Sequence, residues 1–283
     1  MAGILFVIAT PIGNLEDFSP RGKKTLEQAD LILCEDTRRT RNLLSHFGIR
    51  KRTESFHQHN QLRKIPEIIQ WLEQGKKIAL ATDAGTPAVS DPGATLIRHC
   101  LEKGVKVIPI PGPSAITTAL SASGFPSDRF LFLGFLPAKN SERKRALEKY
   151  RDFSETIVLF EAPHRIRKTV KDLLEIFGDR KACLCRELTK IFEEIRLTPL
   201  SRLAQELEKE NLKGEITLII AGAEVNQSDK NKLEDDLKDL IEAMLKEGKT
   251  IKEIILVLSS STNLAKNQIY RSALEIKSRL RNQ

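Results

Sequence analysis

The chain lacks any apolar run close to the roughly 20 residues that a helix needs to span a bilayer. It also lacks a basic segment ahead of its first apolar run, so the pattern of a secretory signal is missing. We therefore expect no membrane span and a cytoplasmic location.

Cysteine is scarce. The 283 residues hold four cysteines, and only Cys183 and Cys185 are close in sequence, at a spacing that puts both on one face of a strand. A chain of this length can bury a sizeable core without disulfides, so buried thiols in a reducing compartment are expected. A zinc site would need further clustered ligands, and the nearest histidine is distant, so no metal is predicted.

The two glycine-rich fingerprints of common nucleotide cofactors are also missing. No strand-end loop matches G-x-G-x-x-G, and none matches G-x-x-x-x-G-K-[ST]. The sequence therefore gives no motif evidence for binding of a nicotinamide cofactor or a nucleoside triphosphate.

What the chain does have is a rhythm of short apolar runs alternating with helical patterns. Ile4–Ala9, Leu31–Cys34, Lys77–Ala81 and Val105–Pro109 read as strands, which predicts an α/β fold on a largely parallel sheet. We expect an N-terminal α/β domain over 1–124, a second α/β domain over 125–224, and a linker with a small helical appendage over 225–283. In the appendage, Thr250 and Asn263 stand where helix N-caps would be, and the pattern fits a helix-turn-helix-like unit or a docking helix pair.

Each of the four N-terminal strands ends in a loop of small and polar residues. In an open α/β sheet, ligands settle outside the carboxyl ends of the strands. Gly and Pro at such ends are also ordinary turn formers, so spacing alone leaves both interpretations open. The loops are Thr10-Pro-Ile-Gly-Asn14, Glu35-Asp-Thr-Arg38, Asp83-Ala-Gly-Thr-Pro87 and Pro111-Gly-Pro-Ser-Ala115.

Positive charge is concentrated in one stretch. The net charge is +8, and the segment from Arg38 to Lys64 holds eight Lys or Arg residues against one acid, Glu54, together with three of the five histidines. Cations hold phosphates, while imidazoles and amides contact exposed bases and 2'-hydroxyls. The stretch predicts an RNA-binding surface, with a solvated basic face as the alternative. The expected RNA contacts are Arg38, Arg39, Arg50, Arg52 and His57.

Seven segments, in order along the chain, carry a family resemblance. The sequence is similar to the small-subunit ribosomal RNA methyltransferase I family of the tetrapyrrole-methylase superfamily. The segments are Thr10-Pro-Ile-Gly-Asn-Leu15, Glu35-Asp-Thr-Arg38, Asp83-Ala-Gly-Thr-Pro87 with Ser90-Asp-Pro-Gly93, Pro111-Gly-Pro-Ser-Ala115, Gly134-Phe-Leu-Pro137, Phe160-Glu-Ala-Pro-His-Arg165 and Arg186-Glu-Leu-Thr-Lys190.

The resemblance implies two α/β domains with S-adenosylmethionine in the cleft between them, a homodimer, and 16S rRNA or the small ribosomal subunit as partner. It implies methylation of the ribose 2'-oxygen of a cytidine in the decoding region. Carried over by position, the cofactor contacts are Pro11, Ile12, Gly13, Asp83, Ala84, Gly85, Ser114, Ala115, Phe160, Glu161 and Glu215.

A ribose hydroxyl is a poor nucleophile at neutral pH, so a general base should assist the transfer. Glu35 and Asp36 end a strand at the expected rim and are the leading candidates, with His57 as a second. The alternative is that both carboxylates merely pair with nearby arginines. Two other functions stay open: methylation of carbon on a tetrapyrrole, and RNA binding without catalysis.

Overall fold

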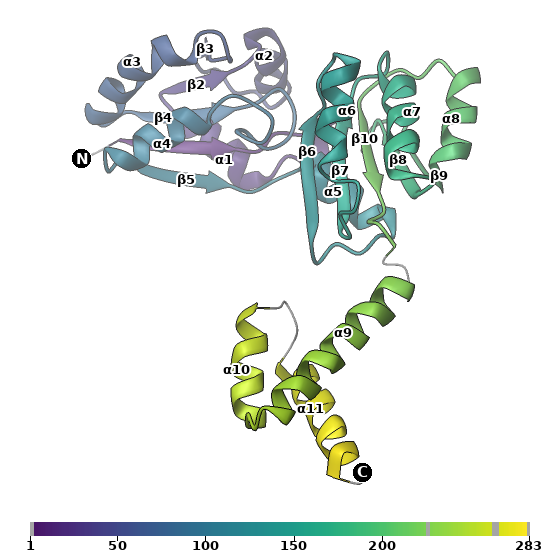
Figure 1. Cartoon of the computed structure of the whole chain (residues 1–283). Coiled ribbons are helices and arrows are strands. Elements are labelled where there is room, and N and C mark those ends of the chain that lie inside the picture. The colour runs from purple at the N-terminus through teal and green to yellow at the C-terminus, as the bar shows by residue number, and fades with distance from the viewer. Residues whose placement is uncertain (1–2, 225–226, 262–265, 282–283) are drawn as a thin grey trace. The chain divides into compact units, whose positions relative to one another are not determined.

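The computed structural model describes residues 3–224, 227–261 and 266–281 (Figure 1). The chain divides into two compact units, Met1–Ala223 and Glu224–Gln283. The first unit contains two five-stranded sheets, and the second is helical.

The first sheet is entirely parallel. Its strands are β1 (Ile4–Ile8), β2 (Leu31–Cys34), β3 (Thr53–Ser55), β4 (Lys77–Ala81) and β5 (Lys106–Ile110), in the spatial order β3-β2-β4-β1-β5. The continuous apolar runs of the central strands reflect burial on both faces of the sheet. β1 lies between β4 and β5, so the order of the strands reverses beside β1, where open α/β sheets bind ligands.

Helices cover both faces of this sheet. The helices α1 (Pro20–Gln28) and α2 (Thr37–His46) cover one face, where Leu26 and Leu44 pack with Ile8. The helices α3 (Gln61–Glu73) and α4 (Ala94–Glu102) cover the other face, where Ile68 and Leu96 pack against its strands. A short 3-10 turn, η1 (Leu15–Asp17), lies between β1 and α1.

Polar caps set where two of these helices begin. Ser19 precedes Pro20, and its side chain accepts a hydrogen bond from the N–H of Gly22. Asp36 does the same for α2, because its carboxylate accepts the N–H of Arg38. Such caps satisfy backbone donors that the first helical turn leaves unpaired.

The second sheet is mixed. Its strands are β6 (Phe130–Phe135), β7 (Thr156–Glu161), β8 (Lys181–Arg186), β9 (Glu194–Pro199) and β10 (Ile216–Ile220), in the order β6-β7-β10-β8-β9. β6 and β7 are parallel, and the remaining pairs are antiparallel. The helices α6 (Asn140–Glu148), α7 (Ile166–Phe177) and α8 (Leu200–Lys209) build the core on one face.

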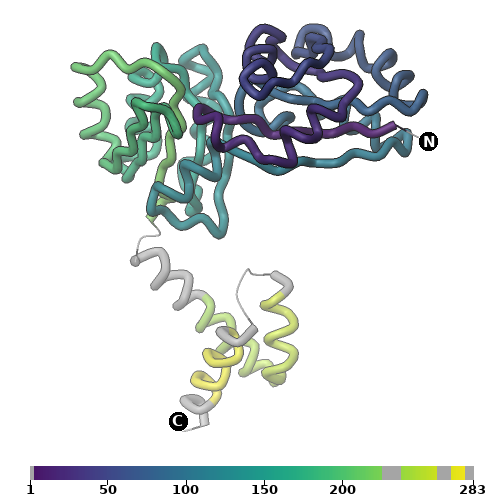
Figure 2. Tube along the Cα trace, turned by 180° about the vertical axis from the view of Figure 1, so that it is seen from behind, coloured from purple at the N-terminus to yellow at the C-terminus, as the bar shows by residue number. Residues whose placement is uncertain are grey.

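The other face of the second sheet holds α5 (Ala115–Ser123) and meets the first sheet's loops. Ile116 and Leu120 of α5 pack with Val158 and Ile219, and Ile12 from the loop after β1 joins the same cluster. Figure 2, seen from behind, shows the segment after β1 reaching the part of the first unit that contains the second sheet. The two sheets are therefore joined by apolar packing at the end of β1.

The described residues of the second unit form three helices that pack together. Its helices α9 (Gln227–Lys246), α10 (Ile251–Ser261) and α11 (Lys266–Arg281) share a core that includes Ile241, Ile254 and Ile269. Thr250 caps α10, because its hydroxyl accepts the N–H of Glu253 while its own N–H donates to the Glu253 carboxylate. The second expected cap, Asn263, lies outside the described residues.

The predicted α/β fold is confirmed, and all four cysteines are buried free thiols as expected. In the described ranges, no helix is both long and apolar enough to cross a bilayer. Two edge strands, β3 and β9, were not predicted. The domain boundary expected near residue 124 stays a prediction, and α5 ahead of it packs on the second sheet.

Candidate functional site

The loops after β1 and β4 pair with each other at the strand ends. The N–H of Thr10 donates to the carbonyl of Gly85 at 2.8 Å, and the N–H of Gly85 donates back to Thr10 at 3.0 Å. Gly85 has a φ of +87°, a region that favours glycine. This bridge holds the Pro11–Gly13 loop beside Asp83 and Ala84.

A cavity of about 620 Å³ opens next to this bridge. Its volume lies within the range of roughly 300 to 1,000 Å³ that small-molecule sites occupy. Loops of the first sheet supply one side, and residues of β7 and β10 supply the other. Predicted site residues in its wall are Ile12, Glu35, Asp36, Arg39, Asp83, Ala84, Gly85, Ser114, Ala115, Phe160, Glu161 and Glu215.

The N-terminus of α5 faces this larger cavity. Ser114 is the N-cap of α5 and has extended backbone angles, but its side chain makes no capping hydrogen bond. The first N–H groups of the helix have no intrahelical partner and carry partial positive charge. Ser114, Ala115 and Ile116 all line the cavity, so this end of it suits a carboxylate.

The loop after β4 is held in strained backbone conformations where it lines the larger cavity. Ala88 and Ser90 have φ values of +66° and +63°, which cost side-chain-bearing residues free energy. Gly93, with φ +139°, closes the loop, and a Cβ there would lie 2.7 Å from Leu80. Strain of this kind concentrates at ligand sites.

Aromatic side chains form the opposite wall. Phe160 packs edge-on against Phe132 with ring centroids 5.0 Å apart, and Phe135 lies 5.6 Å away. A β-bulge between Phe132 and Phe135 includes Gly134 at φ +61°, and bulges redirect side chains next to active sites. Phe135 is 57% exposed as a result, which leaves an aromatic face at the cavity.

The carboxylate of Glu161 is bound to neighbouring protein groups and does not face the cavity as a free charge. Its side chain is fully buried, and its carboxylate accepts hydrogen bonds from Thr169 Oγ1 and the N–H of Ala162. Arg165 Nε lies 3.2 Å from Glu161 Oε1, and its guanidinium also donates to the carbonyl of Leu136. The carboxylate therefore braces the start of α7 instead of pointing a charge at a ligand.

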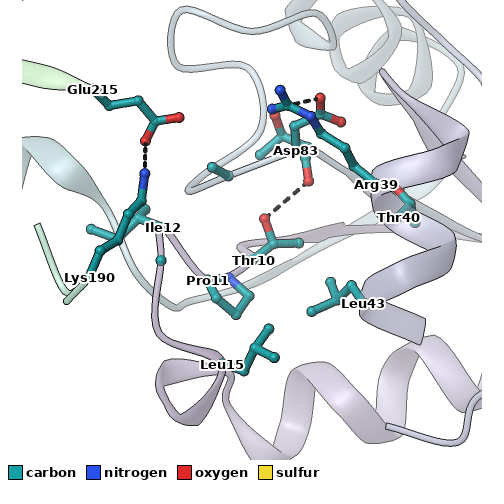
Figure 3. Close-up of a pocket in the computed structure, with 13 residues that line it drawn as sticks. Thr10, Pro11, Ile12, Leu15, Arg39, Thr40, Leu43, Asp83, Lys190 and Glu215 are labelled. Atoms are coloured by element: carbon teal, nitrogen blue, oxygen red, sulfur yellow. Dashed lines mark hydrogen bonds and ion pairs between the residues drawn. The ribbon is translucent and has the colours of Figure 1, made fainter. Parts of the chain in front are cut away.

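A second, smaller cavity of about 240 Å³ adjoins the first (Figure 3). Arg39, Thr40 and Leu43 of α2 line one side, and Lys190 lines the other. Its remaining wall is formed mainly by the loop after β1. That loop includes Pro11 and Gly13, which were predicted to contact the cofactor and line this cavity but not the larger one. Residues that line both cavities are Ile12, Arg39, Thr82, Asp83, Ala84 and Glu215.

Lys190 ends a strained turn that presses against the loop after β1. Glu187 and Thr189 have φ values of +49° and +67°. Thr189 Oγ1 accepts the N–H of Asn14 at 3.0 Å, and Gly13 is so close that a Cβ would lie 2.4 Å from Lys190 Cγ.

Lys190 is held as a cation at the edge of the smaller cavity. Its Nζ lies 2.8 Å from Glu187 Oε1 and 3.0 Å from Glu215 Oε2. Burial alone would lower the pKa of Lys190, but the hydrogen bonds to Glu187 and Glu215 outweigh it and raise the pKa. The ammonium therefore stays protonated through the physiological range.

The two candidate bases differ in their surroundings. Partial burial and the nearby carboxylates of Asp91 and Asp83 raise the pKa of Glu35. In contrast, hydrogen bonds from the side chain and N–H of Arg38 lower the pKa of Asp36. Asp36 also caps α2, so Glu35 has the more basic and less engaged carboxylate.

The predicted RNA contacts do not all reach the cavities. Arg39 lines both, and its Nη1 lies 3.6 Å from Asp83 Oδ2. Arg38 is highly exposed and pairs with Asp36 beside the larger cavity. Arg50, Arg52 and His57 line neither cavity, although His57 is near enough to Glu35 to affect its pKa.

Several residues of the two walls had no role assigned from the sequence. Phe135, Ser90 with Asp91, and Lys190 lie in the quoted motifs, and that clustering was the available signal. Leu15 ends the first quoted motif, and only Leu43 among these residues had no such signal. Across the part of the chain that the structure describes, no group of three or more His, Cys, Asp or Glu residues could hold a metal ion.

Comparison with known proteins gives a consistent family. A family model described as Tetrapyrrole (Corrin/Porphyrin) Methylases matches residues 5–204. Curated relatives named "Ribosomal RNA small subunit methyltransferase I" include one from Pseudomonas aeruginosa, 39% identical over 97% of this chain and 98% of the relative. One from Escherichia coli O157:H7 is 41% identical over 96% of this chain and 95% of the relative.

A relative of the same name from Thermotoga maritima is shorter. It is 45% identical over 222 residues, which are 78% of this chain and 100% of that relative. Its length is thus close to that of the first unit, Met1–Ala223.

Solved structures share the fold at low sequence identity. A diphthine synthase matches with a TM-score of 0.61 at 18% identity, covering 77% of this chain and 90% of that chain. A uroporphyrin-III-C-methyltransferase from Thermus thermophilus matches with a TM-score of 0.54 at 19% identity, covering 78% of this chain and 95% of that chain.

Proposed function

The chain belongs to the tetrapyrrole (corrin/porphyrin) methylase family and is an S-adenosylmethionine-dependent methyltransferase. We propose that its acceptor is the ribose 2'-oxygen of a cytidine in the decoding region of 16S rRNA. The relatives' shared name supports ribosomal RNA as the substrate. The larger cavity, which gathers residues from both sheets, is the observation that carries the assignment of the site.

The wall of the larger cavity fits the chemical groups of this cofactor. The unpaired N–H groups at the start of α5 suit its carboxylate. Asp83, whose side chain is 18% exposed, offers a carboxylate for an ammonium or a ribose hydroxyl. Phe160 and Thr217 offer a mixed apolar and polar wall for the adenine. When bound, the cofactor supplies an electrophilic methyl group on a sulfonium sulfur.

The chain's own contribution to the chemistry is positioning and proton removal. Holding the acceptor in line with the methyl group accounts for much of the rate in such a transfer. We assign Glu35, in preference to Asp36, as the group that takes the proton of the acceptor hydroxyl. The raised pKa of Glu35 makes it the better base, while the cap and Arg38 occupy Asp36.

Among the basic residues, Arg39 is the one placed to hold the acceptor strand. It extends from α2 into the wall of both cavities with its side chain 67% exposed. Arg50 is exposed away from them, and Arg52 pairs with Glu54. The surrounding charge would then contribute general attraction to RNA phosphates.

We further propose a cytoplasmic homodimer. The turn after β8 and the edge strand β9 expose a group of large apolar side chains: Ile191, Phe192, Ile195 and Leu197. Large exposed apolar side chains gathered on one turn and the strand that follows it favour burial against a partner. Replacing Ile191 and Phe192 together by Asp should convert dimer to monomer in analytical ultracentrifugation, and a wild-type monomer would refute the proposal.

The direct test uses purified small ribosomal subunits and labelled S-adenosylmethionine, followed by nucleoside analysis of the 16S rRNA. The expected product is 2'-O-methylcytidine. A methylated base would contradict the proposed chemistry, and label on a tetrapyrrole acceptor instead of RNA would contradict the substrate.

A matched pair of variants tests the placement of the basic residues. Arg39→Glu and Arg50→Glu make the same charge change in the same stretch, but only Arg39 lines the cavities. Arg39→Glu should lower kcat/KM for RNA by at least about tenfold more than Arg50→Glu. Equal effects would mean that the stretch acts as a general basic face.

A further inference from the structure

The smaller cavity lies beside the cofactor site but is much smaller, at about 240 Å³ against about 620 Å³. Resting on the proposed function, we propose that it holds the acceptor nucleotide, with its base or sugar on the apolar floor and its phosphates on two flanking cations. Its floor is formed by Pro11, Leu15 and Leu43, none of which lines the larger cavity. Leu15 and Leu43 have no role in the preceding sections, and Pro11, expected from the family resemblance to contact the cofactor, lies on this side instead.

The two ends of this cavity carry cations from separate parts of the chain. Arg39 stands on α2, and Lys190 stands on the turn after β8, with the apolar residues between them (Figure 3). Two cations flanking an apolar floor match a nucleotide, which has phosphates on either side of an apolar ring face. The ion pairs of Lys190 with Glu187 and Glu215 fix the position of its ammonium.

The position of the cavity also suits an acceptor. Ile12, Asp83 and Ala84 line both cavities and so form the boundary between them. A nucleotide on one side of this boundary therefore lies next to a donor on the other. Enzymes that act on a base extrude its nucleotide from the stack into such a pocket, and the same movement would bring a ribose to this boundary.

The backbone around the smaller cavity is strained in a way that a simple surface cleft does not require. Glu187 and Thr189 both have positive φ values, and Gly214, at φ +88°, admits Glu187 so closely that a Cβ there would lie 2.3 Å from its Cδ. The strained turn places Lys190 against Gly13. Strained turns of this kind are typical of residues held for ligand binding.

The test fills the cavity with a larger side chain. Leu15 lines the cavity and is 36% exposed, so the larger side chain of Leu15→Trp can be accommodated without disrupting the core while it occupies the floor. Leu101→Trp is the matched control, because Leu101 is 62% exposed on α4, lies outside the basic stretch and lines neither cavity. A second variant, Lys190→Gln, removes the fixed cation without changing the floor.

Three readouts separate the possibilities: calorimetry with S-adenosylmethionine, anisotropy with a fluorescent single-stranded RNA containing the target cytidine, and methylation of small subunits. Leu15→Trp should keep the cofactor Kd within about twofold but lower RNA affinity and kcat/KM by at least about tenfold. Lys190→Gln should raise KM for RNA and reduce the salt dependence of binding. Leu101→Trp should behave as wild type.

Two results would overturn the assignment. Weaker cofactor binding by Leu15→Trp, in parallel with the loss of methylation, would mean that the smaller cavity belongs to the methyl donor. Unchanged RNA binding and methylation would mean that nothing occupies the floor. If wild-type protein methylates no RNA, the proposed function fails, and the anisotropy comparison still decides whether a nucleotide uses this cavity.

Discussion

A substitution at Gly13 tests the close packing between the loop after β1 and the turn after β8, because there is no room for a side chain at this position. A Cβ at this position would lie 2.4 Å from Lys190 Cγ, 2.7 Å from Thr189 Oγ1 and 3.1 Å from the carbonyl oxygen of Leu188. Ordinary carbon contacts are about 3.5 to 4.0 Å. Gly13→Ala must therefore push the turn or the loop by about 1 Å.

Neither side of this contact can move freely. Lys190 is tied to Glu187 and Glu215, and Thr189 accepts a hydrogen bond from Asn14. Overpacking of a fixed site costs about 1 to 3 kcal/mol. Loss of the Asn14 hydrogen bond adds about 1 kcal/mol. We expect Gly13→Ala to lower the free energy of unfolding by about 2 to 4 kcal/mol.

The matched control is Gly104→Ala. Gly104 has φ +70°, and a Cβ added there would meet no atom within 4 Å, so its cost is conformational and about 1 to 2 kcal/mol. Urea unfolding followed by circular dichroism measures both variants. Calorimetry should show that Gly13→Ala weakens S-adenosylmethionine binding, because the displaced loop moves Ile12 in the wall of the larger cavity, while Gly104→Ala does not. If the two variants lose equal stability and both bind the cofactor normally, the close contact at Gly13 does not constrain the site.

Three further predictions follow from other contacts. Glu35→Gln should slow methyl transfer by about 10² to 10⁴; the wild-type rate should decrease as the pH is lowered through the raised pKa of Glu35, since the base must be ionised. A pH–rate profile that is the same in both proteins would exclude Glu35. Arg165→Met leaves the buried Glu161 carboxylate without its cation and should cost about 3 to 5 kcal/mol in urea unfolding; adding Glu161→Gln should recover part of the loss, and no recovery would refute the pairing. A chain ending at Ala223 should still bind S-adenosylmethionine in calorimetry, because both cavities lie in the first unit; loss of binding by a folded truncation would contradict this.

The elements that the sequence predicts are those with an unbroken apolar run. β1, β2 and β4 are buried on both faces, so their residues are almost all apolar and visible as strands. β9 differs because it lies at a sheet edge, with Ile195 and Leu197 exposed and the charged Arg196 between them. β3 has three half-buried residues. Neither edge strand has the buried run that the sequence pattern depends on.

For the site, the loops could be predicted because parallel strands end at one edge of a sheet. Glu35 and Asp36 are neighbours in the sequence, so their positions alone could not predict which carboxylate is available to act as the base. The difference comes from Asp36 being the N-cap of α2, and Asp ahead of a helical segment is itself a recognisable cap signal. The smaller cavity depends on contacts between Gly13 and Lys190, far apart in the chain, for which a single sequence holds no distance information.

The division between the two cavities also explains why the second sheet is needed at all. The first sheet alone would present its loops as an open edge, with Asp83, Arg39 and Ser114 facing solvent. β7 and β10 close the larger cavity with Phe160 and Thr217, and the turn after β8 closes the smaller one with Lys190. Because the two closures come from one sheet, and because Ile12, Asp83 and Ala84 line both cavities, a shift at either cavity is transmitted to the other. Binding of the methyl donor and of the acceptor should therefore be coupled, and each ligand should raise the affinity for the other by the same factor. Titrating RNA in the presence and absence of S-adenosylhomocysteine measures that factor, and a value of one would show that the two sites act independently.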